Sequence, residues 1–196
     1  MEQLEKGYNY LEDNIYFFGE VPNNRAVKVA DYKFFWDATD ELAPFGCEEA
    51  YIAFCEISNW LAENPKTPII ECFIWILESW DLELEDFNDD IIESENILRI
   101  IQDMDFYEEL MSLDYTIIST GFGQLILEGK IDMDVKNIIQ LSILRQMSSH
   151  VLDAFLGNNE QWKYERYLYL QKLLETLEEA YPVELNSVKV RKCFLF

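Results

Sequence analysis

Residues 71–114 constrain the fold most strongly, because they combine fifteen acidic side chains with one basic side chain, Arg99, while apolar residues run through the whole stretch. The stretch divides into three parts. Residues 71–80 are apolar on nearly all sides, which is typical of a buried helix. Residues 81–95 hold the densest run of acidic residues and are expected to be exposed. The remaining residues predict short amphipathic helices.

The negative charge is concentrated in the first two-thirds of the chain. The formal net charge is −23, and residues 1–129 carry 29 acidic and 6 basic side chains, whereas residues 130–196 carry nine of each. A field of this sign repels nucleic acid and anionic membrane surfaces, and it attracts basic proteins and cations. We therefore expect a basic protein partner, no direct nucleic-acid binding and no membrane association.

The length and composition indicate a compact globular chain. The 196 residues include 49% hydrophobic and 15% aromatic residues, which is ample material for a core. A chain with this much Phe, Tyr, Ile and Leu is not expected to be disordered. We predict a single all-α domain over residues 1–196. The alternative is a subdivision near residues 129–131, where the charge balance changes.

The cysteines and the chain start predict a cytoplasmic protein. Cys47, Cys55, Cys72 and Cys193 include no pair with the two-residue spacing of a zinc or redox motif. The N-terminal residues lack the basic start and apolar run of a signal peptide. The longest unbroken apolar run, residues 72–77, is too short to cross a bilayer. Free and mostly buried thiols in a reducing compartment are the expected state.

Apolar periodicity and stop signals predict the helices of the first half. The helix over residues 47–62 has an amphipathic stripe and stops before Asn64-Pro65. Thr67-Pro68 predicts an N-cap followed by the first residue of the next helix, over residues 68–80. Residues 1–18 predict a helix, or a helix followed by a short strand. The other expected helices are residues 26–42, 47–62 and 68–80.

The second half predicts further helices. Residues 115–129 favour helix, although they are β-branched and contain two glycines. Asp132 or Asp134 is expected to cap a long helix over residues 135–156, closed by Gly157. Asn158 or Asn159 is expected to cap a final helix that runs to about residue 180 and packs on it as an antiparallel hairpin. Short helices are expected near residues 97–104 and 106–113, and a short strand or extended tail at residues 187–196.

The expected fold class is therefore mainly α. We predict a single compact multi-helix domain of about seven to nine helices, with at most a small β element. The helices over residues 68–80 and 135–156 are the most apolar, and we expect the others to pack around them.

The acidic loop does not match a calcium site. Asp86, Asn88 and Asp90 occupy positions 1, 3 and 5 of an EF-hand loop. Position 6 should be glycine and is Ile91, and position 12 should be a bidentate glutamate and is Ile97. A solvated acidic loop is the better interpretation, and we predict no metal site and no cofactor.

The chain also lacks a complete catalytic motif. Residues 123–130 resemble a phosphate-binding loop, but their glycine spacing is wrong and no Ser or Thr follows. Cys47 lies at a predicted helix start, but Glu48 and Glu49 oppose a lowered thiol pKa. His150 is the only histidine, which leaves neither a paired imidazole site nor a visible partner for Cys47. We predict no catalytic residues.

The acidic stretch is the predicted functional surface. Aromatic and aliphatic side chains interleave with the acids there, and such a mixture can capture a basic protein. The alternative is that the charge only solubilises the protein. The residues predicted to form this surface are Trp80, Asp81, Glu83, Glu85, Asp86, Phe87, Asp89, Asp90, Glu93 and Glu95.

The leading functional hypothesis is a non-enzymatic binding module of the immunity or inhibitor type, which covers a basic toxin or nucleic-acid-binding protein. The first alternative is an enzyme that uses carboxylates, alone or with a divalent cation. Such an enzyme should gather several acids with raised pKa in one concave pocket. The second alternative is a structural subunit of a larger assembly, which should show an exposed apolar patch.

Overall fold

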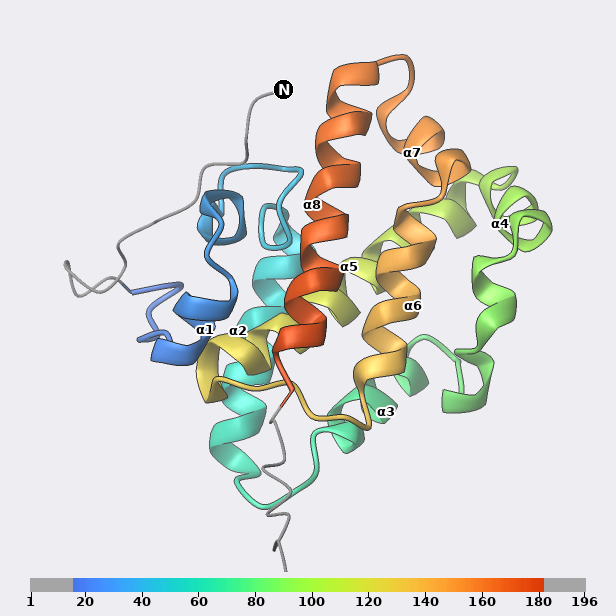
Figure 1. Ribbon diagram of the computed structural model, residues 1–196. Coiled ribbons are helices and arrows are strands. Elements are labelled where there is room, and N and C mark those ends of the chain that lie inside the picture. The colour runs from blue at the N-terminus through green and yellow to red at the C-terminus, as the bar shows by residue number, and fades with distance from the viewer. Residues whose placement is uncertain (1–15, 182–196) are drawn as a thin grey trace, which may run out of the picture.

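The computed structural model describes residues 16–181, without the side chains of residues 104 and 105, and forms a single compact helical bundle (Figure 1). The helix predicted over residues 1–18 lies almost entirely outside this range, and the tail at residues 187–196 lies fully outside it. The described residues contain eight α-helices and no named strand; one isolated antiparallel bridge joins Phe17 and Glu20. The predicted mainly α fold class is confirmed. The helices are α1 (Asn24–Val29), α2 (Glu48–Glu63), α3 (Ile70–Ser79), α4 (Ser94–Ile101), α5 (Met104–Glu128), α6 (Lys136–Gln146), α7 (Ser149–Leu156) and α8 (Glu160–Glu179), with 3₁₀ turns η1 (Lys33–Trp36), η2 (Leu84–Asp86) and η3 (Asp89–Ile92).

Helix α5 is the centre of the bundle. It packs against α1, α2, α4 and α6, and every residue from 117 to 126 is buried. Residues 115–127 contain no charged side chain, so this part of the helix can be surrounded on all sides without burying an unpaired charge. The helix favoured at residues 115–129 is confirmed, but the predicted centre of the fold is wrong, because α5 takes the place expected for residues 68–80 and 135–156.

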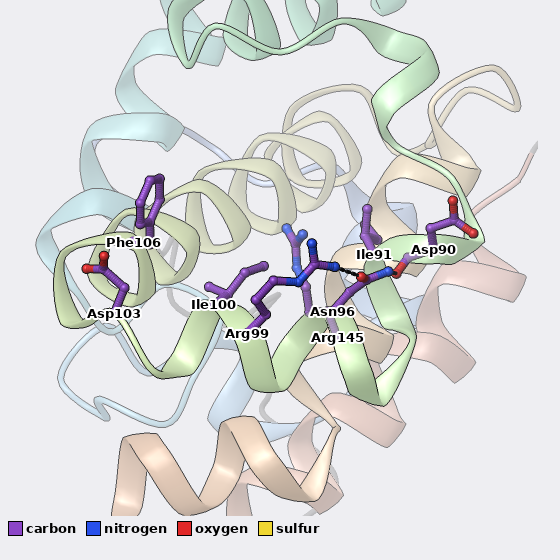
Figure 2. A pocket seen from close by; sticks show the side chains of 8 residues that line it. All are labelled: Asp90, Ile91, Asn96, Arg99, Ile100, Asp103, Phe106 and Arg145. Atoms are coloured by element: carbon purple, nitrogen blue, oxygen red, sulfur yellow. Dashed lines mark hydrogen bonds between the residues drawn. The ribbon is translucent and has the colours of Figure 1, made fainter.

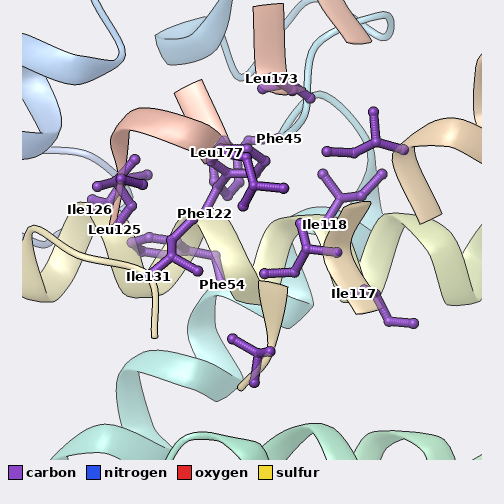
Figure 3. Packing of buried hydrophobic residues seen from close by; sticks show 14 of the residues in the cluster. Phe45, Phe54, Ile117, Ile118, Phe122, Leu125, Ile126, Ile131, Leu173 and Leu177 are labelled. Carbon is purple, nitrogen blue, oxygen red and sulfur yellow. The ribbon is translucent and has the colours of Figure 1, made fainter. Parts of the chain in front are cut away.

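The hydrophobic core joins α5 to α2 and α8. Phe122, Leu125 and Ile126 of α5 lie close to Leu173 and Leu177 of α8 (Figure 3). On another side, an aromatic group meets α2 with ring centroids about 5–6 Å apart, mostly edge to face, which is the favoured arrangement of aromatic pairs. This group consists of Phe17, Phe18, Phe35, Trp36, Phe45, Phe54 and Phe122.

The helix predicted over residues 26–42 is wrong beyond Ala30. Helix α1 ends there, and η1 follows. Phe34, Phe35 and Trp36 are all buried. Three consecutive side chains of an α-helix are spread over about 200° around its axis, so one helix face could not bury all of them. A tight turn set into the core buries all three. The Ala30 carbonyl accepts from the Trp36 indole N–H (2.8 Å) and from the Tyr32 backbone N–H (2.9 Å). It therefore does not continue the hydrogen-bond pattern of α1.

Helix α3 is less buried than its composition predicts. It begins at Ile70, two residues after the predicted start at Pro68, and Ile69 occupies the N-cap position without a side-chain cap. One face, with Phe73 and Leu77, is buried, whereas Trp75 is 54% exposed. The expectation of burial on all sides is therefore wrong, because α3 lies at the edge of the bundle and meets the core on one face.

The long helix predicted over residues 135–156 is two helices. Helix α6 ends at Gln146, and Ser148 has an extended backbone (ψ 134°) before α7 begins. The break lets α7 pack on α4 and α8 while α6 packs on α5 and α8. Asp132 does not cap α6, because its carboxylate accepts from Lys130 (2.7 Å) and Gln124 (3.1 Å).

The predicted start of the last helix is confirmed. The Asn159 side chain accepts from the Trp162 backbone N–H, and α8 runs antiparallel to α6 (Figure 1). Gly157 ends α7 with a positive φ of 58°, as the C-cap prediction required. None of the helices in residues 16–181 combines the length and the apolar character needed to span a bilayer.

Arg25 ties the N-terminal part to the ends of two helices. Its guanidinium donates to the backbone carbonyls of Gly129 (2.6 Å), Glu179 (2.8 Å), Ala180 (3.0 Å) and Tyr181 (2.6 Å). These carbonyls follow or close α5 and α8, where helices leave acceptors unsatisfied and favour a cation. One hydrophobic core contains residues from both sides of residues 129–131.

Candidate functional site

The eight acidic residues of the predicted surface are all exposed. They lie on residues 81–95, here called the acidic segment, which runs through η2 and η3 into the first turn of α4. This segment connects α3 to α4 and carries no basic residue. Its acidic residues are Asp81, Glu83, Glu85, Asp86, Asp89, Asp90, Glu93 and Glu95.

Side-chain bonds to the backbone hold the acidic segment in shape. The Glu83 backbone N–H donates to the Asp86 carboxylate (2.8 Å). Asn88 accepts from the Asp90 backbone N–H (2.9 Å) and donates to the Glu85 carbonyl (2.9 Å). Asx bonds of this kind stabilise turns and compete with regular helix. Asp86 and Asn88, two of the three EF-hand-like positions, therefore serve the local backbone.

Most apolar residues of the acidic segment pack inward, whereas Leu84 is exposed. Phe87 is only 5% exposed, and the Arg145 guanidinium lies over its ring at 5.3 Å from the centroid. Leu82, Ile91 and Trp80 are partly buried against the core. Phe87 therefore fixes the segment to the bundle and cannot be an anchor for a partner, which corrects its assignment to the surface. The alternation of acid and apolar residues separates an outer charged side from an inner packed side.

The basic side chains of the described residues do not pair with the acidic segment. Within residues 16–181, no salt bridge joins any of its eight carboxylates to a basic side chain. Most of the basic residues bond to groups elsewhere in the bundle. These residues are Arg25, Lys130, Lys136, Arg145, Lys163, Arg166 and Lys172.

A pocket of about 460 Å³ opens beside the acidic segment. Figure 2 shows Asp90 at one end, Asp103 and Phe106 at the other, and Arg99 bonded to Asn96 along one wall. Asn96 in turn donates to the Asp90 carbonyl (2.8 Å), which joins η3 to α4. Phe106 is 62% exposed. The pocket thus places the apolar side chains of Ile91, Ile100 and Phe106 next to the carboxylates of the acidic segment.

A buried ion pair closes the inner side of this pocket. Arg145, which also lines it, donates to both carboxylate oxygens of Asp114, at 2.6 and 3.1 Å. Burial raises the pKa of Asp114, while the guanidiniums of Arg145 and Arg166 oppose that rise. Arg166 is also buried and donates to the Leu42 carbonyl (2.5 Å) and to Gln146. Two buried arginines thus surround one buried aspartate.

Cys47 is a protected thiol. It occupies the N-cap position of α2, and burial raises its pKa to about 11, with a further rise from Glu49. A thiol with this pKa is almost entirely protonated at neutral pH, which favours the structural interpretation of Cys47 over a nucleophile. Across the described residues, no three His, Cys, Asp or Glu side chains come together as a group that could hold a metal ion.

Sequence reasoning missed the residues of two pockets. Arg99 and Phe106 lie on the successive helices α4 and α5, and Arg145 joins them from α6, about forty residues further along the chain. A second pocket, described below, joins α2 to α3 and was not predicted at all. One signal was present: Arg145 is the only Asp, Glu, Lys or Arg in residues 137–152, and a charge in such a place usually has a buried partner.

Comparisons of this chain with models of protein families, with curated proteins and with solved structures found no match.

Proposed function

We propose that this protein is a non-enzymatic binding module whose acidic segment covers a basic surface of a protein partner. An immunity or inhibitor protein that neutralises a basic toxin or a nucleic-acid-binding protein is the concrete form of this function. The observation that carries the proposal is the acidic segment itself, with eight exposed carboxylates and no cation of the described chain paired to them.

Electrostatics explains why such a segment suits a binding surface. Eight like charges on fifteen residues repel one another, and a basic partner relieves this repulsion on contact. The inward packing of Phe87 and the turn bonds of Asn88 keep the charges in place before the partner arrives. The acidic segment therefore loses less conformational entropy on binding. The adjoining pocket, with exposed Phe106, offers a place for an apolar side chain of the partner.

The enzyme alternative has no observation in its favour. It requires several carboxylates with raised pKa to converge in one pocket. In the described residues, the carboxyl group whose pKa is raised is Asp114, and it is fully buried and paired with Arg145. The proposal therefore stays with binding.

Affinity capture from the native host, followed by kinetics with the captured protein, tests the proposal. The test variant carries Glu85→Gln, Asp89→Asn, Glu93→Gln and Glu95→Gln, which remove four exposed charges without changing side-chain volume. We expect its association rate at low salt to fall about tenfold, because long-range attraction steers encounter. The wild-type rate should fall steeply with added salt.

A matched variant controls for net charge. Glu41→Gln, Glu71→Gln, Glu78→Gln and Glu179→Gln remove four exposed charges outside the acidic segment. Its association rate should stay within about threefold of wild type, because its changes lie away from the contact. Equal losses in both variants, a salt-insensitive rate, or a captured partner with an acidic binding surface would each contradict the proposal.

A further inference from the structure

A second pocket, of about 320 Å³, lies between α2 and α3, with α5 beneath it. Its volume is at the small end of ligand pockets, which are roughly 300–1,000 Å³, and it suits one long side chain better than a whole metabolite. Helix α3, which forms one wall, ends two residues before the acidic segment begins. The pocket is separate from the one beside Asp90 and shares no lining residue with it.

Two tryptophans and two glutamates define the chemistry of this pocket. Glu56, Trp60 and Glu63 follow one another at spacings of four and three residues on α2, so they share one face of that helix. Trp75 lies across from them on α3 and is 54% exposed. Glu56 and Glu63 are exposed, and no salt bridge within the described chain uses either carboxylate. Indole faces and free carboxylates both attract a cation.

Thr120 of α5 and Cys72 of α3 line the inner part of the pocket. Thr120 is 1% exposed and Cys72 is 3% exposed. Burial raises the pKa of the Cys72 thiol to about 12, with a further rise from the Glu56 carboxylate. The charged side chains that line the pocket are therefore the carboxylates of Glu56 and Glu63, which favour a cation.

We propose that this pocket binds an arginine side chain of the basic partner, with the guanidinium against the indoles of Trp60 and Trp75 and its N–H groups donating to Glu56 and Glu63. The inference rests on the proposed function, which supplies a basic protein. Arginine fits better than lysine, because its planar guanidinium stacks on aromatic faces and donates to two carboxylates at once. Its methylene stem covers the apolar wall.

A blocked tripeptide tests the pocket without knowledge of the partner. Acetyl-Gly-Arg-Gly-amide is titrated into the full chain and followed by NMR, with the indole N–H signals of Trp60 and Trp75 as reporters. Two matched probes are the lysine tripeptide, which keeps the charge without the planar guanidinium, and the citrulline tripeptide, which has nearly the shape of the arginine probe and no charge. We expect saturable shifts of both indole signals with the arginine probe, about fivefold weaker binding with the lysine probe, and no saturation with citrulline.

Variants of the pocket give the second arm. Trp75→Ala should weaken binding of the arginine probe about five- to tenfold, whereas Trp162→Ala, which removes a similarly exposed tryptophan of α8, should leave it unchanged. Glu56→Gln with Glu63→Gln should also weaken binding, whereas Glu41→Gln with Glu179→Gln, which removes two exposed charges away from both pockets, should not. The glutamine variants keep the test decisive if Trp75→Ala does not fold. Equal shifts with arginine and citrulline, or binding that the pocket variants do not change, would overturn the inference.

The two proposals can fail separately. If the acidic-segment variant loses the partner but the pocket variants bind both partner and tripeptide like wild type, the pocket assignment is wrong and the proposed function stands. If the tripeptide binds in the pocket but no basic partner is captured, the pocket assignment stands and the proposed function is wrong.

Discussion

Asp114 and Arg145 show how much depends on a single pair of side chains inside this bundle. Asp114 is completely buried in the middle of α5, and Arg145 of α6 meets it with two hydrogen bonds while its other face covers the Phe87 ring. The same guanidinium therefore pairs the charge of α5, lines the pocket and holds the acidic segment to the body. Loss of Arg145 leaves a carboxylate buried without a counter-ion, which is among the costliest changes a core can undergo.

Arg145→Met should lower the free energy of unfolding by about 3–5 kcal/mol at neutral pH. Asp114→Leu together with Arg145→Met should recover part of this loss, because both charges of the pair are removed, while the buried Arg166 loses the nearby Asp114 charge. Lys172→Met, which breaks the exposed pair with Glu175, should cost less than about 1 kcal/mol and serves as the control. Urea unfolding followed by circular dichroism measures all three.

The cost of Arg145→Met should depend on pH in a defined direction. Burial already raises the pKa of Asp114 in the folded protein, and removal of the opposing cation raises that pKa further. Protonation of Asp114 stabilises the folded variant below this raised pKa, and the benefit is lost as the pH rises through it. The deficit relative to wild type should therefore be smaller at about pH 5.5 than at about pH 8. A deficit that grows on acidification would contradict the buried charge.

At the scale of single elements, α5 depends on two glycines for its central position. A Cβ atom at Gly121 would lie 2.3 Å from Cδ1 of Ile139 on α6, and one at Gly123 would lie 2.8 Å from Cγ2 of Ile57 on α2. Both distances are too short for carbon contacts. The glycines therefore let α6 and α2 approach α5 closely, and this close approach outweighs their poor helix propensity.

Gly121→Ala should destabilise the protein by about 1–3 kcal/mol, although alanine is the better helix former, because the added methyl overpacks the α5–α6 contact. Ile139→Val removes the Cδ1 atom and should recover part of this loss in the double variant, giving a favourable coupling in the double-mutant cycle. Thermal and urea unfolding of the four proteins measure this coupling. Stabilisation by Gly121→Ala alone would mean that the two helices lie farther apart than described.

At the scale of the whole molecule, the charge distribution opposes the compact state. The protein carries a formal net charge of −23. Within residues 16–181, most of the basic side chains bond to groups outside the acidic segment, and no salt bridge joins any of them to its carboxylates. Repulsion of this kind destabilises a folded protein and is screened by salt. The acidic segment is thus expected to lower the stability of the protein.

Added salt should therefore stabilise the free protein. Between about 20 mM and about 300 mM NaCl, we expect the free energy of unfolding to rise by about 1 kcal/mol. The variant with four neutralised residues in the acidic segment should start more stable and gain less. Urea is the denaturant of choice here, because guanidinium chloride is itself a salt. A gain that is equal in this variant and in wild type would place the repulsion elsewhere in the molecule.

The sequence by itself determined the fold class, the limits of α2, the capped start of α8, the glycine end of α7 and the position of the densest acid. These features depend on neighbouring residues: apolar periodicity, Asn and Gly at helix ends, and charge that must stay in water unless it is paired. Residues 115–127 were correctly assigned to a helix, and their lack of charge was a signal for central burial.

Only the tertiary structure decided which helix lies at the centre, where helices break and which side chains meet. The aromatic run at residues 34–36 ended its helix because three consecutive rings found core on different sides. The break at Ser148 arose because α6 and α7 pack on different neighbours, and Phe87 turned inward because Arg145 lies beneath it. Each of the two pockets joins residues of successive elements to one residue from a distant helix, Arg145 in one pocket and Thr120 in the other. Such contacts depend on packing between distant elements, and no local pattern encodes their geometry.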